Sequence, residues 1–565
     1  MDATVDCTTH ASEEKWPLQS RRSVAEKLEQ FKRLDSPWTS RREIAAQINV
    51  CERTLSHWIS RDRAVIRNNS CSCEMARFFG TPDGVDFLHR VLMAAHLVFV
   101  QANDCGIRNL CCFLELSGLG EFIAPSYGAQ QAVAEEQESL LVRFGQEEDQ
   151  RLGSQMPPRE ISLCEDETFH PQICLVSMEP VSNFILLEQY QPQRDATTWN
   201  QCLDERLLGL PITVCQVTSD EAKALIAHAE THLGAHHSPD LFHVQYETVK
   251  ATSAALSSQT RAAFQDPEKA QQRIAALHAQ QDACRQECPQ SSFLQTLEAQ
   301  LQRAETEKAV ACQRSADCQS RQQRAQAARR GLSRDYHPVD IGSGQPVTAN
   351  EVAGRLASHF DALEQVAREA GLSAHAREKL AKARRVLGAM KATVAFFWSM
   401  IAARFESWHL SEPVQQLMRE RLIPAYYLRR VAEKAPTASL RQQLRALSEE
   451  ILAKARSPDS LWATLCPDVQ ADLERKAQHC ADIFQRSSSC VEGRNGQLSL
   501  SHHALHQLTR RKLQSLTVLH NYLVQRDDDS TAAERFYGQR PRDLFSWLLT
   551  QSSLPAHPRA SRRAA

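Results

Sequence analysis

The stretch 158–250 constrains the fold more than any other, because its apolar residues change from helical spacing to strand spacing. Three short β-prone runs come first, ISLCEDETF, ICLVSMEP and FILLEQY, and turn residues separate them, which predicts a three-stranded meander. A helix is then predicted at TTWNQCLDERLL, a buried β-branched strand at ITVCQVTSD and a second helix at EAKALIAHAETHLG, before DLFHVQYETVK. We therefore expect a mixed sheet that combines a meander with right-handed crossovers.

The segment before this sheet is polar and predicts a small DNA-binding domain at 18–70. After the helical stretch SVAEKLEQFKRL and a break at Ser36-Pro37-Trp38, Thr39 or Ser40 can cap a helix at RREIAAQI, and a tight turn leads to CERTLSHWISR. Two short helices around such a turn are typical of a helix-turn-helix. Ala45, Ile48, Leu55 and Trp58 would form its core. The second helix presents the side chains that contact phosphates and base edges, namely Arg53, Thr54, Ser56, His57 and Arg61. An ordinary helical hairpin with a charged face is the alternative.

The other segments are mainly helical. We predict a disordered N-terminus at 1–17, a helical linker or second DNA-binding domain at 71–157, a helical insertion at 251–485 with long helices or a coiled hairpin across 265–330, C-terminal helices at 486–550 and a basic disordered tail at 551–565. The fold class is thus α/β with large all-α parts.

Composition limits the protein's class and its location. The chain has 565 residues, with 66 basic against 68 acidic side chains, so a nucleic-acid surface must arise from local segregation of charge. The N-terminus has no apolar run resembling a signal peptide, and the longest apolar run, at 91–100, is too short to span a bilayer. We expect a cytoplasmic protein whose 18 cysteines are free thiols, because their spacings lack the paired spacers of a zinc site.

Two aspartates fall where adjacent strands of the predicted sheet end. Asp166 lies in the first strand and Asp220 ends the fourth. In a ribonuclease-H-like sheet these strands are neighbours, so the two carboxylates would face each other and stay ionised only with a cation between them. Oxygen ligands at an open site favour Mg²⁺ or Mn²⁺. Taken alone, each aspartate could be structural, Asp220 as a helix cap.

A further motif and a third acid complete the pattern. Asp240-x-x-His243 follows the second predicted helix, and Glu492 begins a late helix, followed by Asn495 and the basic run Arg510-Arg511-Lys512. In this order the residues resemble the DDE transposases of the hAT, Mutator-like and bacterial insertion-sequence families, which carry a Cys/Asp-x-x-His pair after the second aspartate. Those families often insert a large helical domain before the catalytic glutamate.

The resemblance implies specific roles for these residues. Asp166, Asp220 and Glu492 would be catalytic and hold two Mg²⁺ or Mn²⁺ ions, and Asp240, His243 and Asn495 would support the site. Glu165 and Asp166 point to opposite faces of the strand, and the family pattern favours Asp166. Arg510, Arg511 and Lys512 would lie along DNA phosphates, and Arg535, Arg540 and Arg542 are further candidates for DNA contacts.

The resemblance also implies a function: a bacterial, nucleoid-associated DNA transposase with a ribonuclease-H-like core. Such an enzyme binds terminal inverted repeats through its helix-turn-helix and catalyses metal-dependent strand cleavage and transfer into target DNA. Because two transposon ends must be joined, we expect at least a homodimer on DNA. Two alternatives remain, a non-catalytic DNA-binding regulator or inactive, domesticated transposase, and a helical scaffold protein.

Overall fold

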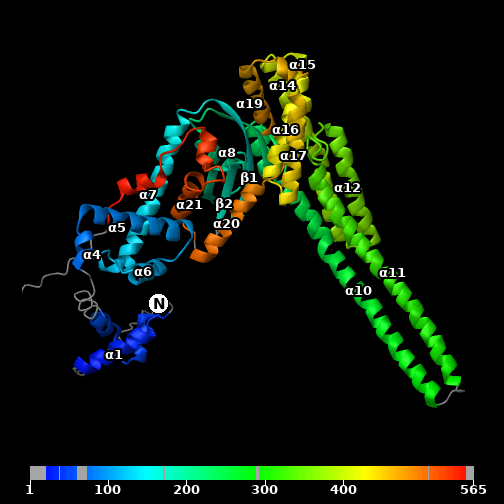
Figure 1. Ribbon diagram of the computed structural model, residues 1–565, viewed down its shortest axis with the longest axis horizontal. Helices are drawn as coiled ribbons and strands as arrows, with labels where there is room; N and C mark the ends of the chain where they lie inside the picture. Colours follow the sequence, from blue (N-terminus) through cyan, green and yellow to red (C-terminus); the bar gives the residue numbers. More distant parts are fainter. Residues whose placement is uncertain are drawn as a thin grey trace, which may run out of the picture. The chain divides into compact units, whose positions relative to one another are not determined.

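The computed structural model describes residues 21–36, 39–59, 73–169, 172–287, 292–506 and 508–554 (Figure 1). The fold is mixed α/β with large helical parts, and it divides into two compact units, Met1–Phe144 with Arg542–Ala565, and Gly145–Pro541. The expected disordered segment 1–17 and residues 555–565 of the expected tail lie outside the described residues.

The first part of unit 1 is a small three-helix cluster. Its elements are α1 (Arg21–Leu34), α2 (Arg41–Gln47) and a helix over residues 52–59. Ser40 is the N-cap of α2 and forms a capping box with Glu43, which determines where this helix begins. Phe31, Ile44 and Leu55 lead the buried core, in which the expected Ala45 and Ile48 are buried and Trp58 packs at the edge.

The rest of unit 1 is helical. Its elements are α4 (Cys73–Phe78), α5 (Pro82–Ala95), the π-helical turn η1 (His96–Ala102), α6 (Ile107–Leu116), the 3-10 turn η2 (Leu119–Glu121), the start of α7 (Tyr127–Gly153) and α23 (Leu544–Gln551). Gly118 adopts a φ of 75° between α6 and η2, a left-handed conformation that glycine favours. The predicted segment 486–550 therefore does not form one domain to its end. Its last helix, α23, belongs to this unit, where Trp547 makes a ring contact with Phe144.

Unit 2 contains the sheet, in the strand order β3-β2-β1-β4-β5. The strands and their intervening helices are β1 (Arg159–Phe169), β2 (Ile173–Glu179), β3 (Phe184–Gln191), α8 (Ala196–Leu207), β4 (Ile212–Ser219), α9 (Lys223–Ala227), η3 (His228–His232) and β5 (His236–Pro239). The meander is antiparallel, whereas β1, β4 and β5 are parallel, as crossovers through α8 and α9 require. The last strand is only His236–Pro239, and Leu241 already begins a helix.

Helices cover both faces of the sheet. Trp199 of α8 and Leu225 of α9 pack on Leu175 and Leu187 from one face. On the other face lie α20 (Ser489–Leu505) against β1 and β2, and α21 (Arg510–Tyr522), followed by α22 (Ala532–Tyr537), against β3. Segments from both ends of unit 2 thus build one three-layered domain.

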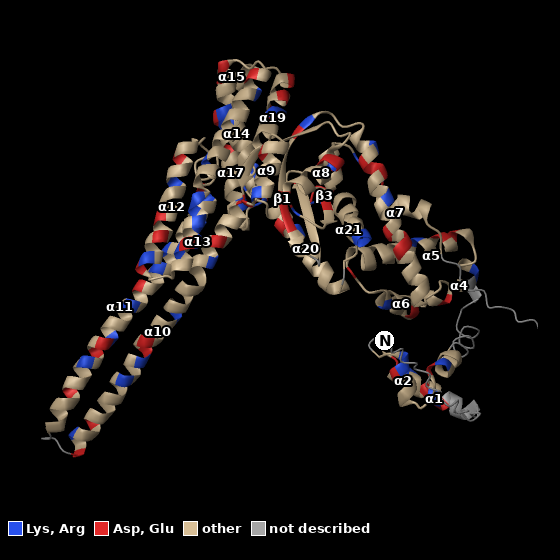
Figure 2. Cartoon of the chain, turned by 180° about the vertical axis from the view of Figure 1, so that it is seen from behind, with Lys and Arg blue, Asp and Glu red and all other residues tan. Residues whose placement is uncertain are grey.

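A long helical insertion separates β5 from α20. It comprises α10 (Leu241–Glu287), α11 (Ser292–Asp335), α12 (Ala349–Glu369), α13 (Ala374–Arg385), α14 (Leu387–Ser407), α15 (Glu412–Leu417), η4 (Met418–Leu422), α16 (Ile423–Glu433), α17 (Ala438–Ala455), α18 (Leu461–Thr464) and α19 (Pro467–Ala481). The first two helices form a long hairpin along which opposite charges alternate (Figure 2). The insertion begins at Leu241, before the predicted boundary at 251.

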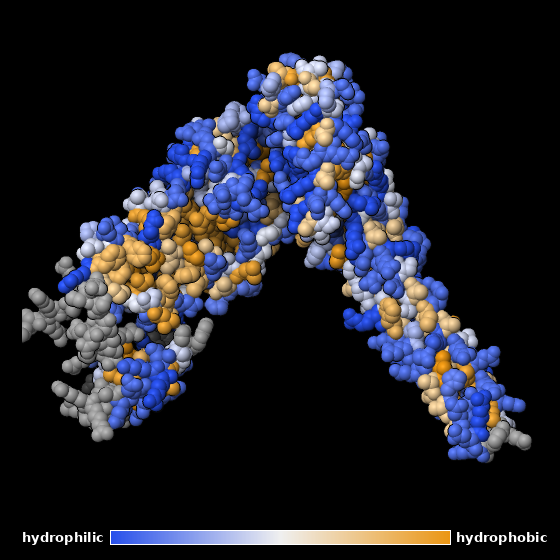
Figure 3. Space-filling model, in the orientation of Figure 1, coloured by the Kyte–Doolittle hydropathy of each residue, from blue (hydrophilic) through white to orange (hydrophobic). Residues whose placement is uncertain are grey.

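Within the described residues, two helical stretches are long and apolar enough to cross a membrane, Pro82–Ala102 and Ala374–Ser407. Length and composition alone are weak evidence, because core helices pass the same test. Both stretches supply buried core residues, such as Leu92 in the first and Phe397 in the second, each with no exposed area. Apolar side chains also lie on the surface of unit 1, where Phe87 and Leu116 are exposed (Figure 3).

Candidate metal centre

The first two predicted acids belong to neighbouring parallel strands, because Asp166 lies in β1 and Asp220 directly follows β4. β1 pairs with β4 in parallel, and Cys164 lies beside Thr218, an offset of 54 residues (218 − 164). The same offset relates Asp166 to Asp220 (220 − 166 = 54), so continuing the register by two residues places them beside each other. The strand pairing thus directs two carboxylates that are distant in sequence toward the same edge of the sheet, and both raise the pKa of His243.

Glu165 and Asp166 point to opposite faces of β1, and their surroundings differ. Glu165 is fully buried toward β2 and η3, where Ser177 Oγ donates to its Oε1 at 3.1 Å and His228 Nε2 lies 3.7 Å from the same oxygen. Asp166 lies on the α20 face, where Asn495 Nδ2 donates to its Oδ2 at 3.0 Å. The structure therefore brings Asp166, and not Glu165, to the predicted third acid.

Glu492 lies in the first turn of α20, close enough to Asp166 for its charge to act on that carboxyl group. Asp166 is 9% exposed. Burial, and then the charge of Glu492, raise the pKa of Asp166 to about 7, and burial also raises the pKa of Glu492. Two carboxyl groups this close share a proton unless a cation replaces it.

Asp240 is a buried junction between β5, α10 and α20. Its Oδ1 accepts hydrogen bonds from the amides of Phe242 and Ser488, both at 2.9 Å, and its Oδ2 accepts from Ser488 Oγ and His243 Nδ1, both at 2.7 Å. Burial raises the pKa of Asp240, but these hydrogen bonds outweigh burial and hold the pKa below its ordinary value. Asp240 thereby fixes the start of α20 relative to β5.

His243 lies between the buried aspartate and the catalytic candidates. The hydrogen bond to Asp240 raises the pKa of His243 to about 9, against the opposing effect of burial. Its other ring nitrogen, Nε2, lies 4.0 Å from Oε1 of Glu492. Protonated His243 thus adds a positive charge beside the cluster of carboxylates.

The residues fit a divalent cation, although the tightest cluster differs from the predicted triad. Among the described residues, Asp240, His243 and Glu492 bring ligand atoms within 4.8 Å of one another. However, all four lone-pair positions of Asp240 already accept hydrogen bonds, which makes it a poor metal ligand. Asp166 and Glu492 hold a proton that a cation can replace, and Asp220 uses Oδ1 to accept from the amide of Ala222. Asp166, Asp220 and Glu492 offer carboxylate oxygens of the kind that Mg²⁺ and Mn²⁺ prefer, and fewer hydrogen bonds occupy them than occupy Asp240.

Two supporting features were missed by sequence reasoning. Arg494 of α20 binds Glu188 of β3 through two hydrogen bonds of 2.7 Å, and Thr517 Oγ1 of α21 donates to the same carboxylate at 2.6 Å. Ser488 organises Asp240 as described above. The one available signal was Glu188 itself, a charged residue inside the apolar strand FILLEQY.

The predicted DNA-binding side chains have mixed positions. In the small N-terminal helices, Arg53 and His57 are exposed, Thr54 and Ser56 are half-buried, and Arg61 lies outside the described residues. In α21, Arg510 and Arg511 are exposed. Lys512 is 5% exposed, so it does not lie on the expected DNA-facing surface, because the side of α21 that it shares with Ser515 and Leu516 is buried.

Comparison with known proteins gives a match over part of the chain. A family of unknown function (DUF6399) matches residues 418–564, a segment that contains Glu492, Asn495 and Arg494. Searches of curated proteins and of solved structures found no match.

Proposed function

We propose that this protein is a DDE-type DNA transposase, in which Asp166, Asp220 and Glu492 form a metal-dependent centre for phosphodiester cleavage and strand transfer. The observation that carries the proposal is that Glu492 lies beside Asp166 at the sheet edge toward which the register of β1 and β4 also directs Asp220. A carboxyl group with only a structural role would not need to be buried beside a second one, an arrangement that raises the pKa of Asp166 to about 7.

The sheet supports the proposal at the level of architecture. A ribonuclease-H-like domain has its first and fourth strands adjacent, and the order β3-β2-β1-β4-β5 with an antiparallel β2 has this property. The catalytic glutamate of the resembling families comes from a helix after a helical insertion, the position that α20 holds here.

Each residue of the centre has a chemical task. Bound divalent ions would activate the attacking oxygen and stabilise the leaving oxygen during in-line displacement. Asp166, Asp220 and Glu492 would hold these ions, and Asn495 keeps the Asp166 carboxylate oriented. His243, held in its charged form by Asp240, would offer a hydrogen bond to a phosphate oxygen.

The N-terminal helices would provide the recognition of DNA ends. The helix over 52–59 exposes Arg53 and His57, and its small core is independent of the other cores. We propose that this part acts as a helix-turn-helix on terminal inverted repeats, with the protein active as a homodimer or larger assembly on DNA.

The test is cleavage of a supercoiled donor plasmid that carries the element's ends, in the presence of Mg²⁺ or Mn²⁺. We expect D166N, D220N and E492Q each to lower cleavage by more than about 100-fold, while E221Q, which changes an exposed acid beside Asp220, keeps it. Full cleavage by D220N or E492Q would show that the acids are assigned wrongly.

A non-catalytic DNA-binding regulator is the second candidate, favoured by the separate N-terminal core with its exposed basic residues. It predicts specific binding of DNA without cleavage under any metal condition. End binding by the wild-type protein, combined with no cleavage in Mg²⁺ or Mn²⁺, would favour this candidate over the transposase.

A further inference from the structure

A large open groove lies within unit 2, behind the junction that Asp240 makes with Ser488. Its volume is about 2320 Å³, and its lining includes Leu241, Phe242, Ser487 and Ser489, the chain neighbours of that junction. One wall comes from the β2–β3 turn and the segment 526–535, and the other comes from α11, α16 and α17. Sites for small molecules usually have about 300–1000 Å³, so this volume suits a polymer better.

The lining of this groove is strongly basic although the chain as a whole is close to neutral. Lysines and arginines outnumber aspartates and glutamates in it by eleven to five. Three of the five acids are already engaged, because Asp482 and Glu433 both pair with Arg430 and Glu179 accepts hydrogen bonds from its own turn at Val181 and Ser182. The net positive charge of the groove is therefore left for an external anion.

Several of the arginines make hydrogen bonds to carbonyl oxygens and not to carboxylates. Arg441 donates to the Ala435 carbonyl at 2.9 Å, Arg526 to the Val181 carbonyl at 3.2 Å and Arg535 to the Ser182 carbonyl at 3.0 Å. Carbonyl groups position a guanidinium without cancelling its charge. Such an arrangement keeps cations ordered and available to a ligand.

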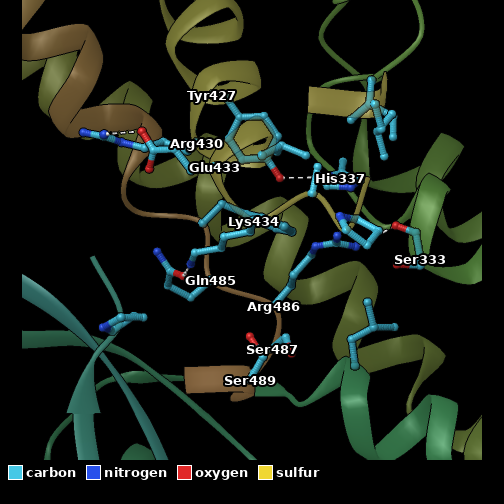
Figure 4. A pocket seen from close by; sticks show the side chains of 18 of the residues that line it. Ser333, His337, Tyr427, Arg430, Glu433, Lys434, Gln485, Arg486, Ser487 and Ser489 are labelled. Atoms are coloured by element: carbon cyan, nitrogen blue, oxygen red, sulfur yellow. Dashed lines mark hydrogen bonds and ion pairs between the residues drawn. The ribbon is translucent and has the colours of Figure 1, made fainter. Parts of the chain in front are cut away.

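Arg486 lies at the inner end of this groove, close to the candidate metal centre. Its Nη1 donates to the carbonyls of Ser333 and Tyr336, at 2.7 and 3.2 Å, and it has no ion pair among the described residues. Burial lowers the pKa of Arg486. Arg486 and Lys434 both extend into the groove (Figure 4), and the carbonyl of Arg486 accepts from the amide of Leu241, next to Asp240. A desolvated cation without a counter-ion is costly, and a bound phosphate would relieve that cost.

We propose that this groove holds the phosphate backbone of DNA and leads it to the candidate metal centre. Repeated single negative charges match a groove lined by arginines from six separate segments, since a polyanion contacts many cations at once. The choice of DNA among polyanions rests on the proposed function. The proposal that the groove binds a polyanion depends only on the charge and shape of the groove.

The test is the affinity of the full-length protein for a short fluorescent DNA duplex of random sequence, measured by anisotropy in EDTA. The double variant R330E/R445E reverses two exposed arginines of the groove for which no side-chain partner is described. Its matched control is R303E/R377E, two exposed arginines outside the groove. We expect the groove variant to bind about tenfold more weakly or worse and to lower the salt slope of log K by about two, while the control changes little.

The outcomes separate this proposal from the proposed function. Metal-free binding does not need catalysis, so D166N should bind DNA like the wild type. Weakened binding by the groove variant, with no cleavage by the wild type, would retain the groove and reject the transposase. Equal affinity of groove and control variants would overturn the groove even if cleavage is robust. Competition by polyglutamate as effective as that by unlabelled duplex would overturn the choice of DNA.

Discussion

Arg494 and Glu188 form a bidentate ion pair in the interior, with both hydrogen bonds at 2.7 Å and side-chain exposures of 6% and 0%. The pair joins α20 to β3, and Thr517 joins α21 to the same carboxylate. Glu492 lies two residues before Arg494 on α20. The position of the third candidate ligand on the sheet is therefore set by a charge pair that makes no contact with a metal.

Removing one member of this pair should destabilise the protein strongly. R494M leaves Glu188 charged and buried, which costs about 3–5 kcal/mol, whereas the double variant E188Q/R494M leaves no buried charge and should cost less. Urea unfolding of the full-length protein measures the loss of unfolding free energy in both variants. The control R273M breaks the exposed Arg273–Glu307 pair and should cost less than about 1 kcal/mol. Equal costs for R494M and R273M would contradict a supporting role for the pair.

The hydrogen bond between His243 and Asp240 should make stability depend on pH at the alkaline side. The pKa of His243 is raised from 6.5 to about 9, so its contribution is complete below pH 6.5 and is lost as pH rises through 9. Because the side chain is 35% exposed, we expect His243 to contribute about 1–2 kcal/mol to the free energy of unfolding, which is less than the full pKa shift would give. The measurement compares wild type and H243Q at pH 6 and pH 10. A difference between them that does not shrink at pH 10 would contradict this origin.

The sheet and its aspartates could be predicted from the sequence because patterns among neighbouring residues indicate strands and turns. Strand spacing gave the meander and the crossover strand, and these placed Asp166 beside Asp220 once the strands were ordered. The cap at Ser40 followed likewise from local rules. Glu492 was predicted only through resemblance, because no local pattern relates it to a strand more than 300 residues away.

Other features could not be read from the sequence, because they depend on distant parts of the chain. The groove draws arginines from β1, from within the insertion and from the segments that follow the insertion, and their convergence is a property of the fold. The face of α21 was also not predictable, because its basic run has no amphipathic signal to show that Lys512 turns inward. The orientation of Glu165 away from the site was not predictable either, because its buried neighbour there, His228, belongs to η3 and is distant in sequence.

His520 should make the protein less stable in mild acid. Burial, and then the charge of Arg494, lower the pKa of this half-buried histidine from 6.5 to about 4, while its Nε2 donates to the Asn183 carbonyl at 2.8 Å. The unfolded chain therefore takes up a proton below pH 6.5 that the folded protein refuses until about pH 4. Stability should fall by up to about 3 kcal/mol across this range, and H520Q should flatten the slope. Thermal unfolding between pH 7 and pH 4 checks this, and an unchanged slope in H520Q would exclude His520 as the source.

Asp166 should limit the stability of the metal-free protein. Its pKa is about 7 in the folded protein and 3.8 in the unfolded chain. Ionised Asp166 therefore lowers the free energy of unfolding by its full amount above pH 7, and by less as the pH falls toward 3.8. D166N removes this charge and should raise the metal-free free energy of unfolding by a few kcal/mol at pH 8, and by less at pH 5.

Millimolar Mg²⁺ or Mn²⁺ should stabilise the wild type at pH 8 but not D166N, because a cation relieves the same cost. E221Q provides the control, and it should respond to the metal as the wild type does. If D166N were less stable than wild type at pH 8 in EDTA, Asp166 would be a structural carboxylate and the centre would lose its first ligand.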